Sequence, residues 1–266
     1  MRFFYPLILL AVFFVGGVAY AAAWLQEQGK GQMIHSVYHY SADKFLDVDG
    51  NKLDQTSFFK LEDNIYIEYG LREDITLGLN PSIQMMEQGA EYTWGLADTE
   101  IFARKKMWQN DASVFSIQPL IKIPGPYNKD RNLKLGNKQV DLELRTLFGH
   151  GFSIKDKDLF SNFELAYRYR AGEPGNQIKF DATIGLKQND NLMFVLQSFN
   201  SLAVTSPEVN SFNSVNSTDY DLSKIQISAV SKISPDKSVQ LGVFKDVWGK
   251  NTGSGGGILL SLWSSF

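Results

Sequence analysis

Charged side chains recur at every second position in the middle of this chain, where apolar residues fill the positions between them. In QVDLELRTLF, for example, Asp141, Glu143 and Arg145 alternate with apolar residues. Alternate side chains of an extended chain point to opposite faces, so these charges share one face. The charged positions that we expect to line such a face and act on a solute are Asp98, Glu100, Arg104, Asp141, Glu143, Arg145, Glu164, Arg168 and Arg170. Because both signs are present, the face predicts either ion pairs or a constriction that selects solutes by charge.

Catalysis is the competing chemistry, and the sequence disfavours it. His35 and His39 are four residues apart, about 13 Å on a strand, which is too far to share a metal ion. The remaining histidine, His150, lies near an expected turn, and the chain has no H-E-x-x-H, P-loop or G-x-S-x-G motif. The stretch from Asp47 to Asn51 resembles the start of a calcium loop but lacks its distal carboxylate, so we interpret it as a turn. We expect no enzyme, no cofactor and no metal site.

The elements that carry these charges are predicted to be β-strands. From Gln177 to Lys187, apolar residues at even positions alternate with mostly polar residues at odd positions, and similar segments of about 10 to 14 residues fill the chain. The expected strands lie near 32–41, 57–70, 75–87, 95–107, 113–123, 138–149, 158–170, 176–187, 191–203, 219–233, 238–248 and 256–266. Soluble β-sandwiches also alternate, but their strands are usually shorter, at about 5 or 6 residues.

The connectors between these strands are expected to alternate in length. Short ones at 72–74, 109–111, 188–190 and 234–236 interleave with longer ones at 42–56, 88–94, 124–137, 171–175, 204–218 and 249–255. An even count of about twelve strands with short turns at one rim is typical of outer-membrane barrels. The predicted fold class is therefore all-β: a transmembrane antiparallel β-barrel, closed between its first and last strands. Aromatic girdles are expected from Tyr38, Tyr40, Tyr66, Tyr69, Trp94, Trp108, Tyr167, Tyr169, Tyr220, Trp248 and Trp263.

The first residues have the layout of an export signal. Arg2 precedes an apolar run from Phe3 to Val18, and small residues fit a cleavage site at Ala19 and Ala21, or at Ala21 and Ala23. We expect residues 1–23 to be a cleaved signal peptide and residues 24–266 to form the barrel. An uncleaved membrane anchor is the alternative. The exported part is then soluble, peripheral or a β-barrel, and the barrel pattern predicts the bacterial outer membrane.

The last residues, GGILLSLWSSF, end on an apolar aromatic residue. Gly257, Leu260, Leu262 and Phe266 are expected to form the barrel-closing strand, with the apolar side chains turned to outer-membrane lipid. This tail resembles the C-terminal signature that the barrel-assembly machinery recognises in outer-membrane barrels. The expected partners are therefore lipid, that machinery and a small-molecule solute.

Composition narrows the function further. The net charge of −3 gives no basic surface for nucleic acid, and the absence of cysteine excludes disulfides. A barrel of about twelve strands lies between side-chain-filled barrels and wide porins, which predicts a narrow channel for small solutes. The alternative is a structural or adhesive barrel whose lumen is plugged and whose loops at 42–56 and 204–218 bind partners.

The middle of the chain also resembles a known family. The residues that carry the resemblance are Tyr69-Gly70, Thr76-Leu77-Gly78, Gly95 with Asp98 and Glu100, and Lys122-Ile123-Pro124. They resemble outer-membrane barrels of the phenol-degradation meta-pathway transporter type, although Gly125-Pro126 replaces the usual Thr-Gly. The resemblance implies a monomeric uptake channel for small aromatic or hydrophobic compounds, with Asp98 and Glu100 as a lumen-facing functional pair. A structural role, in which that pair is neutralised by Arg104 or Lys106, is the alternative.

Overall fold

The computed structural model describes residues 22–128, 131–172, 175–204 and 219–266. Their secondary structure is a single 14-segment sheet. Its segments are β1 (Gly31–Leu46), β2 (Lys52–Arg72), β3 (Ile75–Asn80), β4 (Ser82–Gln88), β5 (Glu91–Leu96), β6 (Thr99–Gln109), β7 (Ser113–Ile123), β8 (Asp141–Ile154), β9 (Lys157–Arg170), β10 (Gln177–Asn189), β11 (Leu192–Ala203), β12 (Asp221–Ser234), β13 (Lys237–Lys250) and β14 (Thr252–Ser265). Within these residues, no helix is long and apolar enough to cross a membrane.

Four of the segments are halves of two longer strands. β3 and β4 pair with consecutive parts of β2, and β6 and β5 pair with β3 and β4 in turn. Pro81 separates β3 from β4 because it has no N–H to donate to the ladder. The fold is therefore a closed antiparallel barrel of 12 strands, which confirms the predicted fold class and strand number.

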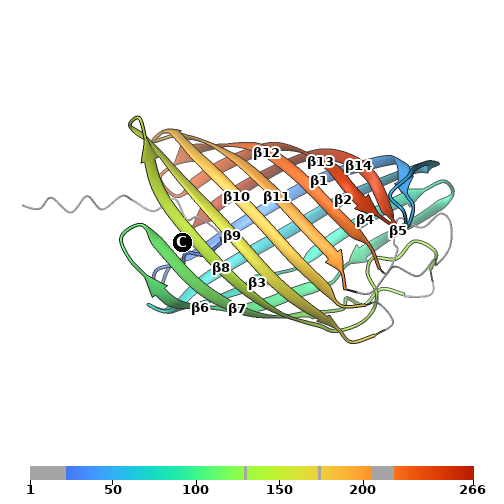
Figure 1. Ribbon diagram of the computed structural model, residues 1–266, viewed down its shortest axis with the longest axis horizontal. Coiled ribbons are helices and arrows are strands. Elements are labelled where there is room, and N and C mark those ends of the chain that lie inside the picture. Colours follow the sequence, from blue (N-terminus) through green and yellow to red (C-terminus); the bar gives the residue numbers. More distant parts are fainter. Residues whose placement is uncertain (1–21, 129–130, 173–174, 205–218) are drawn as a thin grey trace, which may run out of the picture.

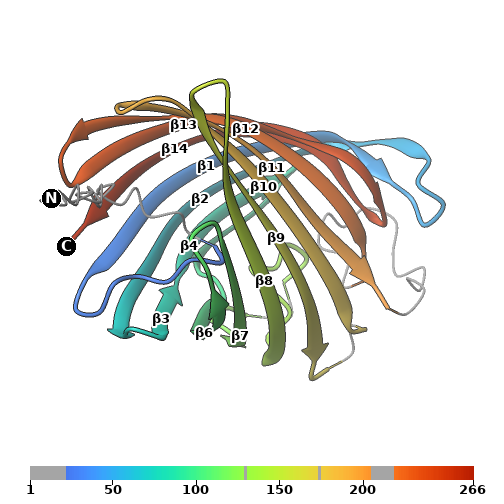
Figure 2. The ribbon, with the colours of Figure 1, turned by 60° about the vertical axis from the view of Figure 1, so that its left-hand side comes forward.

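The barrel closes where the two ends of the sheet meet. β1 pairs with β2 on one side and with β14 on the other, from Gln32 opposite Ser265 to Leu46 opposite Thr252. At the rim, the Phe266 N–H donates to the Gly31 carbonyl at 2.9 Å, and the Gly31 N–H donates to the Phe266 carbonyl at 2.7 Å. The strands run obliquely around the cylinder, and β14 ends beside the start of β1 (Figures 1 and 2).

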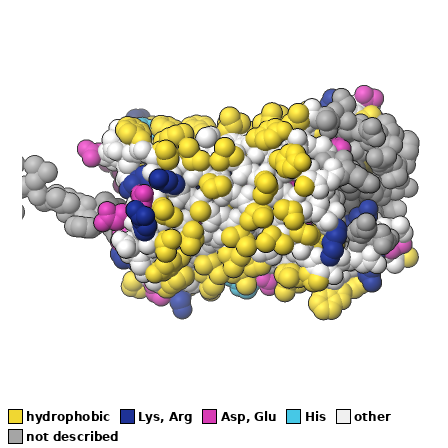
Figure 3. Space-filling view, turned by 90° about the horizontal axis from the view of Figure 1, so that it is seen from below, with side chains coloured by type: hydrophobic (Ala, Val, Ile, Leu, Met, Phe, Trp, Pro, Cys, Tyr) yellow, Lys and Arg dark blue, Asp and Glu magenta, His cyan; other side chains and the backbone are white. Residues whose placement is uncertain are grey.

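The outer surface of the barrel is apolar. Leu142 and Leu144 of β8 are 52% and 57% exposed, whereas Asp141 and Glu143, which alternate with them, are buried inside. The same alternation holds for Ile258, Leu260 and Leu262 on β14. Hydrophobic side chains cover the middle of the face in Figure 3, and charged side chains gather toward its ends. The predicted orientation, with apolar side chains outward, is thus what the structure shows.

The predicted aromatic girdles are only partly correct. Six of the residues point outward and are 42–68% exposed: Tyr69, Trp94, Trp108, Tyr167, Tyr169 and Trp248. The others point into the barrel: Tyr38, Tyr40, Tyr66, Tyr220 and Trp263. Proximity to a strand end does not distinguish the two faces, because only the parity of a residue decides which face it occupies.

Several predicted long connectors are short turns. β1 and β2 are joined by 47–51, β4 and β5 by 89–90, and β13 and β14 by Asn251 alone. The predicted lengths of the loops at 42–56, 88–94 and 249–255 are therefore wrong. The strands continue past the segments where polar and apolar residues alternate clearly. The connector after β7, at 124–140, is long as predicted. The proposed contact loop at 204–218 lies almost wholly outside the described residues.

The glycine-rich start of β14 explains one of these errors. Gly255 and Gly257 have no side chains to show alternation, yet both lie close to the backbone of β1, Gly257 opposite Tyr40 and Gly255 at an irregularity in the pairing. A Cβ on Gly257 would overlap the carbonyl oxygen of His39, and one on Gly255 would overlap that of Ser41. Glycine is required here because the closing strands approach each other too closely for any side chain.

Gly257→Ala is expected to destabilise barrel closure, since the new methyl group meets a backbone atom that cannot rotate away. Overpacking of this kind costs about 1–3 kcal/mol or more. The measurement is the midpoint of heat-induced unfolding, followed by the change in gel migration of the refolded protein. Gly151→Ala is the matched control, because its Cβ would meet nothing closer than 3.8 Å. Equal midpoints for the two variants would contradict the closure argument.

Candidate functional site

A ladder of ion pairs crosses one inner wall of the barrel. Arg168 of β9 binds Glu100 of β6 and Glu143 of β8, each at 2.6 Å. Arg145 continues the ladder, binding Glu143 at 2.8 Å and Asp181 of β10 at 2.8 Å, and it also pairs with Glu164. Each arginine therefore bridges carboxylates on different strands, as partly buried charges require.

A second group of charges lies beside the loop at 124–140. Lys122 of β7 binds Asp98 at 2.9 Å and Asp141 at 2.7 Å. Tyr127, in that loop, donates a hydrogen bond to Asp98, and partial burial together with this carboxylate raises the pKa of the Tyr127 hydroxyl. Asp98 therefore ties the long loop to the barrel wall.

Two more charged contacts complete the set. Arg104 binds Glu68 at 2.8 Å, and the side chains are 2% and 0% exposed. Arg170 lies 3.7 Å from Asp219. The structure thus places every predicted charged residue in at least one ion pair. Neither Asp98 nor Glu100 pairs with Arg104 or Lys106, and their partners, Lys122 and Arg168, come from strands farther along the chain.

The segment before β1 lies inside the barrel. The backbone of Ala23, which is fully buried, donates to Asn162 Oδ1 at 3.4 Å and accepts from Ser116 Oγ at 2.8 Å. The carbonyl of Trp24 accepts a hydrogen bond from Arg104, and the Gln26 side chain donates to Glu68. These contacts hold Ala22–Gly29, which we call the N-terminal segment, against the wall that carries the buried Arg104–Glu68 pair.

Apolar and amide side chains line the opposite wall. A cavity of about 290 Å³ is bordered by Phe160, Met193, Val195, Gln197, Gln240 and Trp263, among others. Sequence reasoning assigned apolar residues to the lipid face and missed this lining. The run Leu192–Leu196 is apolar at every position, however, and an unbroken run predicts a strand that is apolar on both faces.

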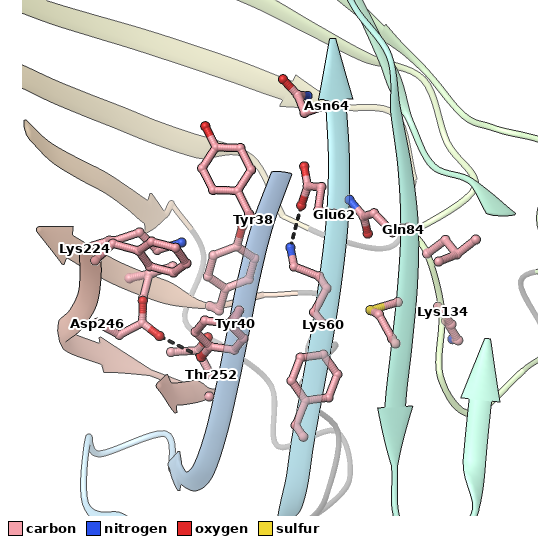
Figure 4. Close-up of a pocket in the computed structure, with 18 of the residues that line it drawn as sticks. Tyr38, Tyr40, Lys60, Glu62, Asn64, Gln84, Lys134, Lys224, Asp246 and Thr252 are labelled. Carbon is pink, nitrogen blue, oxygen red and sulfur yellow. Dashed lines mark hydrogen bonds and ion pairs between the residues drawn. The ribbon is translucent and has the colours of Figure 1, made fainter. Parts of the chain in front are cut away.

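A larger cavity of about 530 Å³ lies at the other end of the lumen, toward the long loop. Tyr40 and Phe244 stack across it with an interplanar angle of 1°. Lys60 binds Glu62 at 2.8 Å, and the Tyr40 hydroxyl donates to Asp246 at 2.7 Å (Figure 4). Leu135 of the long loop forms part of the lining, so this loop narrows the lumen from inside.

A third cavity, of about 200 Å³, lies beside the other two. Tyr38 borders all three, so the cavities meet at its side chain. Neither Arg145 nor Arg168 lines any of the three, whereas Asp181, at the end of the ion-pair ladder, lines the third cavity. Tyr38 was expected in a lipid-facing girdle, and its position at this junction could not be read from the sequence.

The histidines do not line these cavities. His35 and His39 are on the outer face of β1, where His35 contacts Asp63 at 2.8 Å and His39 packs against Phe59. His150 lies near the rim and hydrogen-bonds Ser113 at 2.8 Å. In the described ranges, no three His, Asp or Glu side chains are grouped to hold a metal ion.

The Asp47–Asn51 stretch is a turn, as interpreted from the sequence. Asp47 accepts hydrogen bonds from the backbone N–H groups of Asn51 and Asp49. These bonds lower the pKa of the Asp47 carboxyl, because they stabilise its ionised form. The carboxylate is thus occupied within its own turn.

Comparisons with known proteins identify the fold. No protein-family model and no curated protein matches the chain. The COG4313 outer membrane channel from Pseudomonas putida F1 is 13% identical, with a TM-score of 0.73 over 94% of this chain and 100% of that one. The chain has the fold of an outer-membrane channel. The KdgM porin (10% identity, TM-score 0.52, 88% and 99% covered) and the NanC porin (8%, 0.51, 86% and 98%) are also similar.

These likenesses confirm the coarser part of the family resemblance, an outer-membrane barrel of the porin-like kind. A shared fold does not establish that the protein is a transporter of the phenol-degradation type. Solute class and the roles of the charged residues must be argued from this lumen.

The Arg104–Glu68 pair gives a test of how much the paired charges stabilise the barrel. Glu68→Gln leaves the Arg104 guanidinium buried with only neutral acceptors, and removing one partner of a buried pair costs about 3–5 kcal/mol. We expect a large fall in the free energy of unfolding by urea in lipid vesicles. Glu27→Gln is the control, because Glu27 pairs with Lys30 on the exposed surface. Equal effects from the two substitutions would show that the buried pair adds no stability.

Proposed function

We propose that this protein is a passive channel for small solutes in the bacterial outer membrane. The observation that carries the proposal is the set of three cavities that meet at Tyr38. They follow the lumen between the long loop at one end and the N-terminal segment at the other. The fold shared with channels and porins supports the same function.

The lining of the lumen favours aromatic or hydrophobic solutes. Phe160, Met193 and Val195 face the cavity nearest β14, and Tyr40 and Phe244 face the cavity nearest the long loop. Amide side chains such as Gln197 and Gln226 lie between them. Apolar surfaces with a few polar groups bind apolar ligands of small size. This preference agrees with the solute class that the sequence resemblance implies.

Export through a cleaved signal and insertion by the barrel-assembly machinery belong to the same proposal. Residues 1–21 lie outside the described residues. Ala22 and Ala23 are buried in the barrel, which favours cleavage after Ala21 over cleavage after Ala23. The exposed Phe266 at the end of β14 is available to the assembly machinery as the predicted C-terminal signal.

A plugged barrel with a structural or adhesive role is the second candidate, and the N-terminal segment is the observation that favours it. Ala23 and Trp24 occupy lumen space against β6, β7 and β9. The two candidates differ in whether solute passes this segment.

Conductance across a planar lipid bilayer separates the candidates. We expect small, steady single-channel currents from the full chain. Deletion of Trp24–Gln28 should increase them, because it removes side chains and backbone from the lumen. Glu27→Gln combined with Lys30→Gln is the control, since it alters only an exposed pair of the same region. Currents that appear only after the deletion would support the plugged barrel, and no current from either form would contradict the channel.

Asp98 and Glu100 are proposed to contribute to ion selectivity. Asp98→Asn with Glu100→Gln removes two negative charges from the lumen wall, which should shift the reversal potential in a salt gradient toward anion preference. Asp63→Asn is the control, because Asp63 lies on the outer face with His35. An unchanged reversal potential would show that Asp98 and Glu100 do not contribute to ion selectivity. Their role would then be structural, through the contacts to Lys122 and Arg168.

A further inference from the structure

Two lysines in the lumen form no close ion pair with a carboxylate. Within the described residues, no Asp or Glu oxygen lies within 4.0 Å of the ammonium group of Lys179 or Lys224, and neither donates a hydrogen bond. Almost all other charged side chains on the inner wall are paired. An ammonium ion inside a narrow lumen is costly unless it finds an anion or water, so both lysines are available to an anionic ligand.

Both lysines face the same small cavity. Lys179 is on β10 and Lys224 is on β12, and both line the cavity of about 200 Å³. On β11 between them, Ser201 lies beside Lys179 and Phe199 lies beside Lys224. Two strand spacings and a stagger of two residues along β11 separate the lysine backbones by roughly 12 Å. Two side chains of this length can converge on one anionic group across that span.

Aromatic and apolar side chains form much of the remaining lining of this cavity. Phe199, Tyr38, Phe244 and Leu222 lie around the lysines, and the polar residues Asp181, Ser201 and Gln226 complete the lining. The Lys224 ammonium lies 4.9 Å from the centre of the Phe244 ring and 5.9 Å from that of Tyr40. The positive charge of Lys224 therefore adjoins flat aromatic surfaces (Figure 4). A ligand that matches both features carries a negative group and an aromatic ring.

The nearby carboxylates are largely engaged elsewhere. Asp181, which also lines the cavity, accepts from Arg145 at 2.8 Å and from the Asn200 N–H at 3.2 Å. Asp246 lies opposite Lys224 in the register and accepts from the Tyr40 hydroxyl. Its other oxygen has no hydrogen-bond partner within the described residues, which makes it the nearest competitor for Lys224.

We propose that Lys179 and Lys224 form a binding site for small aromatic carboxylates inside the lumen. The carboxylate lies between the two ammonium groups, and the ring packs against Phe199 and Phe244. This inference rests on the proposed channel function and adds a charged group to its solute class. Such a site attracts the anion into a narrow path, and conduction requires that the site also release it.

The test is calorimetric titration of the detergent-solubilised full chain with sodium benzoate. We expect saturable binding that weakens at least about tenfold in Lys179→Gln and in Lys224→Gln, as loss of a charged hydrogen bond implies. Benzyl alcohol, which keeps the ring and lacks the charge, should bind the unaltered protein and both variants equally. Lys245→Gln is the matched control, because Lys245 lies on the outer face of β13 and its loss should not change benzoate affinity.

A further variant addresses the competing carboxylate. Asp246→Asn keeps an acceptor for the Tyr40 hydroxyl and removes the charge opposite Lys224, so benzoate affinity should stay equal or rise. A fall as large as that in Lys224→Gln would show that the cluster is structural, and would overturn the proposal. Equal benzoate affinity in the doubly substituted Lys179→Gln, Lys224→Gln chain, or no saturable binding to the unaltered chain, would also overturn it.

Bilayer currents from the same preparations separate the two proposals. If the protein conducts but does not bind benzoate, the proposed site is wrong and the proposed channel function stands. If the protein binds benzoate but does not conduct, the site stands and the proposal of passive transport is wrong.

Discussion

The structure depends on one constraint: every backbone N–H and C=O in a hydrocarbon layer needs a partner within the protein. An unpaired group there costs several kcal/mol, so a sheet in a membrane cannot have an edge. The pairing of β14 with β1 meets this requirement along the whole length of β1. It also explains why Gly255 and Gly257 stand where side chains would prevent close approach, and why Phe266 exchanges backbone hydrogen bonds with Gly31.

Closure turns one face of every strand inward, and the inner face must then accommodate charge. The barrel does this in two ways on its two sides. From β6 to β10, arginines and carboxylates pair across strands, and Arg168 and Arg145 each bridge several acids. From β10 to β14, apolar and amide groups such as Val195 and Gln240 share the inner face with a few charges, among them Lys179 and Lys224. The lumen is therefore asymmetric, with a dense ion-pair ladder on one side and fewer charges among apolar and amide groups on the other.

The fold was predictable from sequence because the alternation of residues has a single explanation in a membrane barrel. Leu142 and Leu144 could not face water while Asp141 and Glu143 faced lipid, so parity alone oriented the strand. The lining of the lumen was less predictable. Met193 and Phe194 are both apolar, and the pattern does not say which one faces inward.

The partners in the ion pairs could not be predicted from the sequence either. Glu100 pairs with Arg168, which is 68 residues away, because β6, β7, β8 and β9 lie in register. Pairing of that kind depends on the stagger of the whole barrel, and a local pattern carries no information about it. The N-terminal segment was missed for a related reason. Its residues show no alternation, and their place is set by Asn162, Ser116 and Arg104 on distant strands.

The contacts of the same segment lie mainly on one side of the lumen, which is compatible with the proposed channel. Its hydrogen bonds go to the side of the lumen that carries the buried Arg104–Glu68 pair, where donors and acceptors are available. On the apolar side it contributes only Trp24, which packs edge-to-face on Phe160 with the ring centres 6.3 Å apart. Trp263 packs against the same apolar cluster. Aromatic side chains therefore border the lumen toward the rim where β1 begins, while the hydrogen bonds to the backbone of the segment come from Arg104, Ser116 and Asn162.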